Sequence, residues 1–292
     1  MILRDKPGIL ALLFAVRGSV LPHIAPQLLF VALFSAAVVA VDRHILTLPH
    51  VQAAPLAVLG VALSLFLGFR NNAAYDRWWE ARRLWGGLLA DSRSVAREAE
   101  IFLPDPQDRH RLLSAMRAFL HQHRCALRNL PPDAAALRDA PGTSTPDATL
   151  DAIGTELAKA LRAGRLDGFG ARTLSTRLSG IALAQAGCER IKLTPLPYVY
   201  SLLIFRTSWL YCLLLPFALL EPTGWLTPLF AVIVAYTFFG LAEVTEELAH
   251  PFGPTANALP LDAICRAAEI SLAPHLGEDP PPPLQPVGYR LD

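Results

Sequence analysis

Charged residues are scarce in this chain of 292 residues. They make up 17% of the sequence, against about 25% in an average soluble domain, whereas hydrophobic residues reach 53%. The formal net charge is only +1, and no basic tract shows the clustering that contacts to nucleic-acid phosphates require. The four cysteines are far apart and form no CxxC pair. We therefore expect no nucleic-acid partner, and free thiols instead of disulfides.

Residue patterns typical of enzymes are also missing. The sequence contains neither a paired nucleophile and base nor a cluster of metal ligands. Residues 247–250 have the ExxH spacing of helical di-iron proteins, but such sites need a second copy and further carboxylates, and this chain has no second copy. We predict no enzymatic activity, no metal site and no cofactor.

Four long apolar windows dominate the sequence instead. They cover residues 24–41, 51–69, 198–220 and 222–242; three contain no charged residue, and the other holds only Arg206. Each is close to the ~20 residues that a helix needs to cross a bilayer core about 30 Å thick. We predict an all-α integral membrane protein with four transmembrane helices and a cytosolic helical region over residues 70–197.

The distribution of basic residues predicts the orientation in the membrane. Arg4, Lys6 and Arg17 precede the first window, and six arginines lie between Arg70 and Arg97. The loop between the first two windows carries only Arg43. Because cytoplasmic segments carry the excess of Lys and Arg, we place both termini in the cytoplasm and this multi-pass protein in the lipid bilayer of the plasma (inner) membrane.

Helical spacing of apolar residues continues outside the windows. It predicts helices over residues 70–103, 107–130, 150–163, 172–191 and 261–272. Residues 131–151 are rich in Pro, Ser, Thr and Asp, which predicts an exposed loop, and the apolar patch 8–16 predicts an interfacial helix. The Pro-rich tail, residues 273–292, should be extended or disordered. No internal repeat is visible, and we predict no strand.

The most informative stretch is residues 51–97, where an apolar window continues without a turn signal into an arginine- and tryptophan-rich helix. Positions four apart share one face of a helix; one such line is Ala57, Val61, Leu65 and Phe69, and its neighbour is Gly60, Ser64 and Gly68. Small residues allow close helix contacts in membranes. Around a symmetry axis the large apolar line would form rings, a hydrophobic constriction. Alternatively, it faces lipid or other helices.

Several motifs resemble the bestrophin family, in its bacterial branch. They are residues 65–69 followed by Arg77-Trp78-Trp79-Glu80, then residues 187–191, Thr194-Pro195 with Pro197-Tyr198, Phe205-Arg206-Thr207, and Glu246-Glu247 before Pro251-Phe252-Gly253. The resemblance covers residues 1–272 and implies a homopentameric ion channel with a central axial pore. It implies a membrane neck at Val61, Leu65 and Phe69, and a cytosolic aperture that we assign to Phe169.

Two departures from the family pattern affect function. Animal bestrophins carry an acidic calcium clasp after Pro-Phe-Gly, whereas here only Asp262 follows in that segment. Since calcium needs six to eight oxygen ligands, we predict no calcium clasp. In the neck, Val61 and Leu65 replace bulkier residues, and leucine lacks the polarised ring edges of aromatic residues.

The permeant species are expected to be small inorganic ions. We favour chloride and similar anions, because arginines between Arg70 and Arg177 would make the cytosolic vestibule positive. The alternative is the same architecture selective for monovalent cations such as Na⁺ or K⁺. A secondary transporter is disfavoured, since such folds contain repeats.

Charged residues near the cytoplasmic ends of the windows predict structural ion pairs. Glu243, Glu246 and Glu247 lie at a helix end and should face arginines such as Arg70 or Arg77. Arg206 lies inside an apolar window, where an ionisable residue is costly and usually functional. It either lines the permeation path or pairs with an acidic side chain near the inner interface, and we favour the pair.

Overall fold

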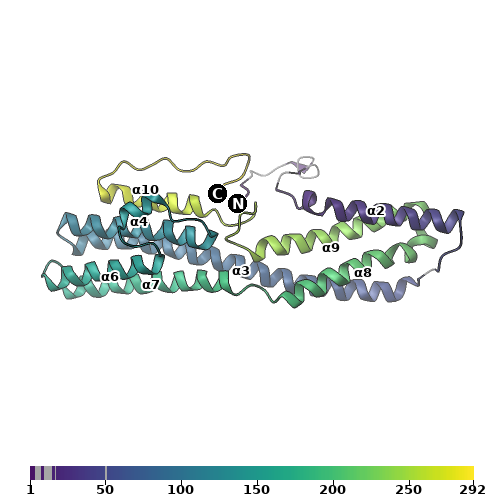
Figure 1. Cartoon of the computed structure of the whole chain (residues 1–292), viewed down its shortest axis with the longest axis horizontal. Helices are drawn as coiled ribbons and strands as arrows, with labels where there is room; N and C mark the ends of the chain where they lie inside the picture. Colours follow the sequence, from purple (N-terminus) through teal and green to yellow (C-terminus); the bar gives the residue numbers. More distant parts are fainter. Residues whose placement is uncertain (4–7, 10–14, 17, 50) are drawn as a thin grey trace. The chain divides into compact units, whose positions relative to one another are not determined.

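The computed structural model of the chain describes residues 1–3, 8–9, 15–16, 18–49 and 51–292. Within these residues it is helical, with isolated β-bridges and no strand (Figure 1), which confirms the all-α prediction. The chain divides into two compact units: the apolar unit, residues 5–78 and 195–250, and the charged unit, residues 1–4, 79–194 and 251–292. The predicted interfacial helix over residues 8–16 lies mostly outside the described residues, as do Arg4, Lys6 and Arg17.

The apolar unit is built from four helices. They are α2 (Leu21–His44), the first part of α3 (Ala53–Phe102), α8 (Tyr198–Thr223) and α9 (Thr227–Ala249). α2 packs against α8 and α9, which also pack against each other. A 3-10 turn, η1 (Gly224–Leu226), connects α8 to α9, and Gly224 adopts φ +53°, a conformation that favours glycine. This turn explains why α9 begins five residues later than the predicted window at residue 222.

Three stretches are long and apolar enough to cross a membrane, judged by length and composition. They are α2, α3 and the stretch Tyr198–Ala249. The last stretch contains α8, η1 and α9, so the third and fourth predicted spans both fall within it. The apolar core between the helices includes Val31, Leu67 and Ala235, all fully buried.

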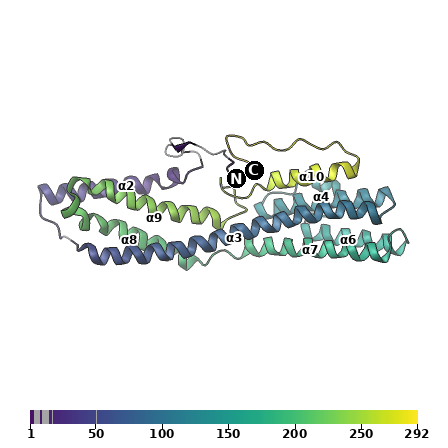
Figure 2. The same ribbon diagram turned by 180° about the vertical axis from the view of Figure 1, so that it is seen from behind.

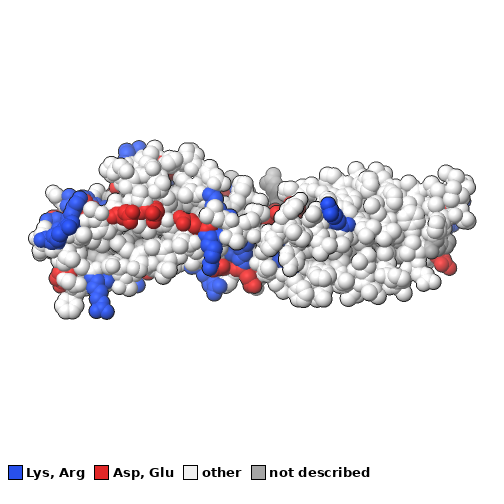
Figure 3. All heavy atoms as spheres, turned by 60° about the horizontal axis from the view of Figure 1, so that its bottom comes forward, with Lys and Arg blue, Asp and Glu red and all other residues white. Residues whose placement is uncertain are grey.

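The charged unit contains the rest of the helices. They are the second part of α3, α4 (Pro106–Arg128), α5 (Ala134–Asp139), α6 (Pro146–Arg162), α7 (Gly168–Leu193) and α10 (Leu261–Leu276) (Figure 2). α4 is central, since it contacts α5, α6, α7 and α10. Its core includes the fully buried Trp85, Phe119 and Ile181. Charged side chains gather on the surface of this unit, and few are visible on the apolar unit (Figure 3).

Local capping explains where these helices start. Asp105 and Asp133 accept hydrogen bonds from backbone N–H groups two residues on, at 2.9 and 2.8 Å, which stabilises a helix N-terminus. Thr145 caps α6 in the same way, with Pro146 at the first helical position. The prediction of a loop over residues 131–151 is therefore wrong for α5, because an N-cap followed by three alanines forms a short helix. It is also wrong for the start of α6, which the Thr145 cap sets at Pro146.

The Pro-rich tail was expected to be extended or disordered from residue 273. α10 continues to Leu276, four residues into that range, and the segment after it is without helix. Leu3 N–H donates to the Tyr289 carbonyl at 2.8 Å, and Leu291 N–H donates to the Met1 carbonyl at 2.9 Å. The two ends of the chain therefore lie side by side (Figure 1). These backbone bonds, which composition does not reveal, compensate for the lack of regular structure.

Candidate functional site

The predicted neck residues lie on one uncovered face of α3. Val61, Leu65 and Phe69 are 71%, 56% and 60% exposed. The opposite face, including Leu63 and Leu67, is buried against the apolar unit. The packing of α3 thus turns the large apolar line away from its own chain, so a single subunit leaves these three side chains uncovered.

The line of small residues divides into two parts. Gly60 is buried, and a Cβ at this position would lie only 2.9 Å from the Tyr211 hydroxyl of α8. A Cβ added at Gly68 would have no neighbouring atom within 4 Å. The close helix contact expected from the sequence is therefore made within the chain at Gly60, while the surroundings of Gly68 are open.

Phe169 lies at the first turn of α7 in the charged unit. Its side chain is 80% exposed, and Asp167 caps the helix by accepting from Gly170 N–H at 2.6 Å. Gly170 is in tight contact, since a Cβ there would meet Leu166 and Phe102 at 2.7 Å. The cap and this contact hold the turn in place and leave Phe169 pointing away from the core. A Cβ at the preceding Gly168 would meet nothing within 4 Å.

Of the predicted ion-pair residues, the structure brings Arg70 and Glu246 together. The Arg70 guanidinium lies 2.7 Å from the Glu246 carboxylate and also donates to Ser201 Oγ at 2.8 Å. Arg77 Nε instead donates to the Ala249 carbonyl at 2.8 Å. This bond satisfies a carbonyl at the end of α9, where a cation is favourable.

The other predicted partners are placed differently. Arg206 is exposed and has no ion-pair partner in the part of the chain that the structure describes. Glu247 is buried, whereas Glu243 is half-buried and lines a cavity. The favoured ion pair of Arg206 is therefore not formed among the described residues of one chain.

That cavity, the Arg70 cavity, lies in the apolar unit and has a volume of about 390 Å³. Its polar lining is Arg70, Ser201, Ser208, Gln27, Glu243 and Glu246, and its apolar lining includes Ile24, Ile204, Phe205, Trp209 and Phe239. Our sequence analysis missed Ser208 and Trp209. The signal for Ser208 was the seven-residue spacing from Ser201, which places both hydroxyls on one face of a mostly apolar helix.

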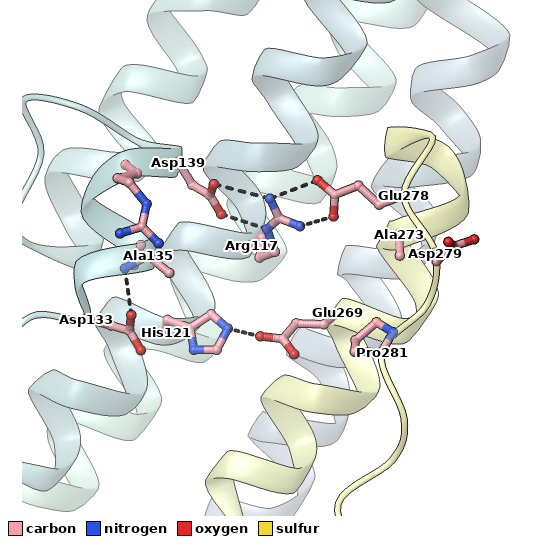
Figure 4. A pocket seen from close by; sticks show the side chains of 12 residues that line it. Arg117, His121, Asp133, Ala135, Asp139, Glu269, Ala273, Glu278, Asp279 and Pro281 are labelled. Atoms are coloured by element: carbon pink, nitrogen blue, oxygen red, sulfur yellow. Dashed lines mark hydrogen bonds and ion pairs between the residues drawn. The ribbon is translucent and has the colours of Figure 1, made fainter.

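A second cavity, of about 370 Å³, lies in the charged unit between α4, α5, α10 and the tail (Figure 4). Arg117 donates to Asp139 at 2.7 Å and to Glu278 at 2.5 Å, and His121 lies 2.7 Å from Glu269. Burial tends to raise the pKa of Glu269, but the hydrogen bond from His121 and nearby positive charge outweigh it and lower this pKa. Through these contacts the cluster attaches α10 and the tail to α4.

Arginines of the charged unit fall into two groups. Many are paired: Arg165 with Asp108 at 2.7 Å, Arg177 with Glu98 at 2.9 Å and Arg190 with Glu80 at 2.5 Å. The hydrogen bond from Arg165 lowers the pKa of Asp108. Others are exposed and have no ion-pair partner among the described residues, including Arg83 and Arg97 on α3 and Arg172 on α7. Arginines of this second group carry an uncompensated positive charge.

Sites for metals or thiol chemistry are not evident in the described residues. No group of three or more His, Cys, Asp or Glu side chains is placed to hold a metal ion. The four cysteines are free and buried, and burial raises the pKa of the Cys188 thiol to about 12. The Cys188 thiol is thus protonated and poorly nucleophilic at neutral pH.

Comparison with known proteins identifies close relatives of the whole chain. Residues 1–274 match the family model described as Bacterial/Fungal Bestrophin protein. A protein of Mesorhizobium japonicum named voltage-dependent anion channel-forming protein mll4386 is 47% identical over 290 residues, which cover 96% of this chain and 94% of that protein. The Escherichia coli voltage-dependent anion channel-forming protein YneE is 41% identical, with 93% of each chain covered.

A solved structure supports the same relationship. The crystal structure of a bacterial bestrophin homologue from Klebsiella pneumoniae superposes with a TM-score of 0.82 at 35% identity. The match covers 88% of this chain and all of that chain.

Proposed function

This chain belongs to the bacterial and fungal bestrophin family, and we propose that it is a membrane channel for chloride and similar small anions. We propose that five copies assemble around a central axis lined by α3. The observation that carries this proposal is the uncovered apolar face of α3, where Val61, Leu65 and Phe69 are all more than half exposed. An exposed apolar face of this kind is expected to be buried against lipid or against further copies of the chain. Because relatives are named as anion channels, we favour further copies arranged around a pore.

In this arrangement the three side chains form successive apolar rings. Valine, leucine and phenylalanine rings repel water, so a narrow neck of this type gates by dewetting. Phe169 forms a second constriction in the cytosol. Its 80% exposure and firmly capped helix turn support this role, because a constriction needs a side chain that is free of its own core but fixed in position.

The choice of anions rests on charge. Arg83, Arg97 and Arg172 are exposed without ion-pair partners among the described residues, and basic linings attract anions.

One observation favours the cation alternative. Asp76 is exposed on α3, seven residues after Phe69 and hence on the same helix face. A ring of aspartates below the neck would favour cations.

Reversal potentials test the function directly. The protein is reconstituted in planar bilayers, and single-channel currents are recorded across a range of voltages under a potassium chloride gradient. We expect discrete openings that reverse close to the chloride equilibrium potential. Reversal near the potassium value would support the cation alternative, and Asp76→Asn should then reduce that selectivity. A complete lack of discrete openings would contradict a channel.

Stoichiometry and topology are tested separately. Native mass spectrometry of detergent-purified protein should give a particle of five chains. Labelling of a single cysteine introduced at either terminus, with a membrane-impermeant reagent in inverted vesicles, should place both termini in the cytoplasm, in accordance with the inner-membrane orientation that we propose. A monomeric particle would contradict the axial pore.

A further inference from the structure

The Arg70 cavity lies where the apolar helices end. Arg70 follows the predicted second window, which stops at residue 69, and Glu243 follows the fourth, which stops at residue 242. Tyr198 begins the third window and also lines the cavity. By these boundaries Arg70, Tyr198 and Glu243 are at the depth of the lipid headgroups, and the cavity extends from there along α8 to Ser208 and Trp209, about 15 Å further into the apolar unit. Its volume of about 390 Å³ is within the range of ligand sites, roughly 300–1,000 Å³.

Three hydrogen-bond donors that line this cavity have no acceptor. They are Arg70 Nε, Ser208 Oγ and Trp209 Nε1, each buried and without a partner among the described residues. Arg70 is 8% exposed and Ser208 only 1%. Leaving a buried donor unpaired is costly. Three unpaired donors around one space therefore favour a ligand with several acceptor oxygens, and a phosphate group has them.

The cavity also contains an excess of negative charge. Its charged residues are one arginine, Arg70, and two glutamates, Glu243 and Glu246, which gives a formal charge of −1. Glu246 is paired with Arg70, but Glu243 has no ion-pair partner among the described residues. A purely anionic ligand would be repelled by Glu243, whereas a ligand that also carries an ammonium group would neutralise it.

The remaining wall is apolar and aromatic. Ile24, Ile204 and Phe205 line it, together with Phe239, whose ring centroid is 5.0 Å from that of Trp209. Such a wall is suited to acyl chains or the glycerol end of a lipid. We propose that the Arg70 cavity binds a phospholipid whose headgroup carries both a phosphate and a primary ammonium, as an ethanolamine headgroup does. The phosphate accepts from Arg70, Ser208 and Trp209, and the ammonium donates to Glu243.

Lipid binding can be measured without any ion current. The full-length protein is delipidated in detergent and titrated with phosphatidylethanolamine, phosphatidylcholine and phosphatidylglycerol of matched acyl chains, and native mass spectrometry counts the bound lipids. We expect phosphatidylethanolamine to bind at least tenfold more tightly than either of the others. Phosphatidylcholine keeps the positive charge but has no N–H group to donate, and phosphatidylglycerol has no positive charge.

Variants locate the binding to the cavity. Ser208→Ala and Glu243→Gln should each weaken phosphatidylethanolamine binding at least fivefold. Ser35→Ala is the matched control for the first, because Ser35 is also fully buried with an unpartnered hydroxyl but does not line the cavity. Glu221→Gln, at an exposed glutamate of the same unit, is the control for the second. Both controls should bind like the unmodified protein.

Two results would overturn the proposal. Equal affinity for the three lipids, with no effect of Ser208→Ala or Glu243→Gln, would mean that the protein carries only non-specific surrounding lipid. Glycerophosphoethanolamine is the same headgroup without acyl chains. If it binds as tightly as the complete lipid, the acyl chains contribute nothing and the proposal that the ligand is a lipid is overturned. Because these measurements do not depend on conduction, a protein that fails as a channel but binds the lipid leaves this inference intact.

Discussion

At the scale of single residues, Leu65 is the most direct test of the neck. It occupies the middle of the exposed apolar line on α3 and is 56% exposed. In Leu65→Ala the ring of leucines becomes a ring of methyl groups, which widens the constriction and eases its wetting. We expect a severalfold higher conductance or open probability in single-channel recordings. Leu210→Ala, at a leucine of α8 that is 51% exposed, should leave the current unchanged.

Phe169 tests the cytosolic constriction. If its ring narrows the pore, Phe169→Ala should increase conductance severalfold. Gly168→Leu provides the converse change, since a side chain there meets no neighbour within 4 Å and adds apolar bulk next to Phe169. We expect this variant to reduce conductance. An increase in Gly168→Leu, or no change in Phe169→Ala, would remove this turn of α7 from the permeation path.

His123 makes the charged unit sensitive to acid. Its side chain is fully buried between the rings of Trp85 and Phe119, with centroids 5.4 and 5.7 Å away. Burial lowers its pKa to about 4. As the pH falls below about 6.5, the unfolded chain binds a proton at this residue and the folded chain does not. The free energy of unfolding should therefore fall by about 3 kcal/mol between pH 6.5 and pH 4, with no contribution above that range.

The measurement is thermal unfolding in detergent at pH 7.5 and pH 4.5. His123→Phe keeps an aromatic ring in the stack but cannot be protonated, so the loss of stability at the lower pH should shrink. His110→Phe replaces an exposed histidine of the same helix and should retain the full pH dependence. If the two variants respond equally to pH, the buried imidazole is not the cause.

At the scale of helices, the contact between α3 and α8 depends on Gly60. An added Cβ would lie 2.9 Å from the Tyr211 hydroxyl and 3.2 Å from its ring, so Gly60→Ala forces the helices apart or the ring out of place. Overpacking of this kind costs about 1–3 kcal/mol. We expect a lower unfolding temperature for Gly60→Ala in detergent.

Two comparisons isolate this contact. Gly68→Ala makes the same substitution on the same helix where nothing lies within 4 Å, so the protein should unfold at the same temperature or higher. Tyr211→Phe removes the nearest atom and should restore part of the stability lost in Gly60→Ala. An additive effect of the two substitutions would contradict direct contact between them.

At the scale of the whole molecule, unpaired arginines are the proposed source of selectivity. Replacing Arg83, Arg97 and Arg172 with glutamine removes three positive charges that have no ion-pair partner among the described residues. The reversal potential should then move away from the chloride value and toward that of the cation. This effect should weaken as ionic strength increases, because salt screens exposed charges.

The control removes the same total charge elsewhere. Arg111, Arg177 and Arg190 are each already paired with a carboxylate, at 2.6, 2.9 and 2.5 Å. Their replacement with glutamine should shift the reversal potential less than replacement of the unpaired set. Equal shifts would show that net charge, and not the position of the arginines, sets the effect.

Most helices followed from local patterns, but some ends did not: α6 begins at Pro146 and α7 at Gly168, each four residues before the predicted start. Apolar windows and apolar spacing predicted every long helix of the described chain, and the predicted helix end at residue 103 lies one residue beyond the end of α3 at Phe102. The short helix α5 was missed because its cap, Asp133, lies in a segment whose overall composition is typical of loops. The prediction of Val61, Leu65 and Phe69 as one face needed only the helical repeat.

Long-range packing of the helices determined which side chains become partners, and the helical repeat of the sequence does not contain that information. Arg70 and Glu246 are 176 residues apart, and only the docking of α9 on the apolar unit selects this pair from several candidate glutamates. The same docking leaves Glu243 unpaired and encloses three unpaired donors in one cavity. A helical repeat specifies which side chains share a face, but burial and partnership depend on the helices that pack against that face.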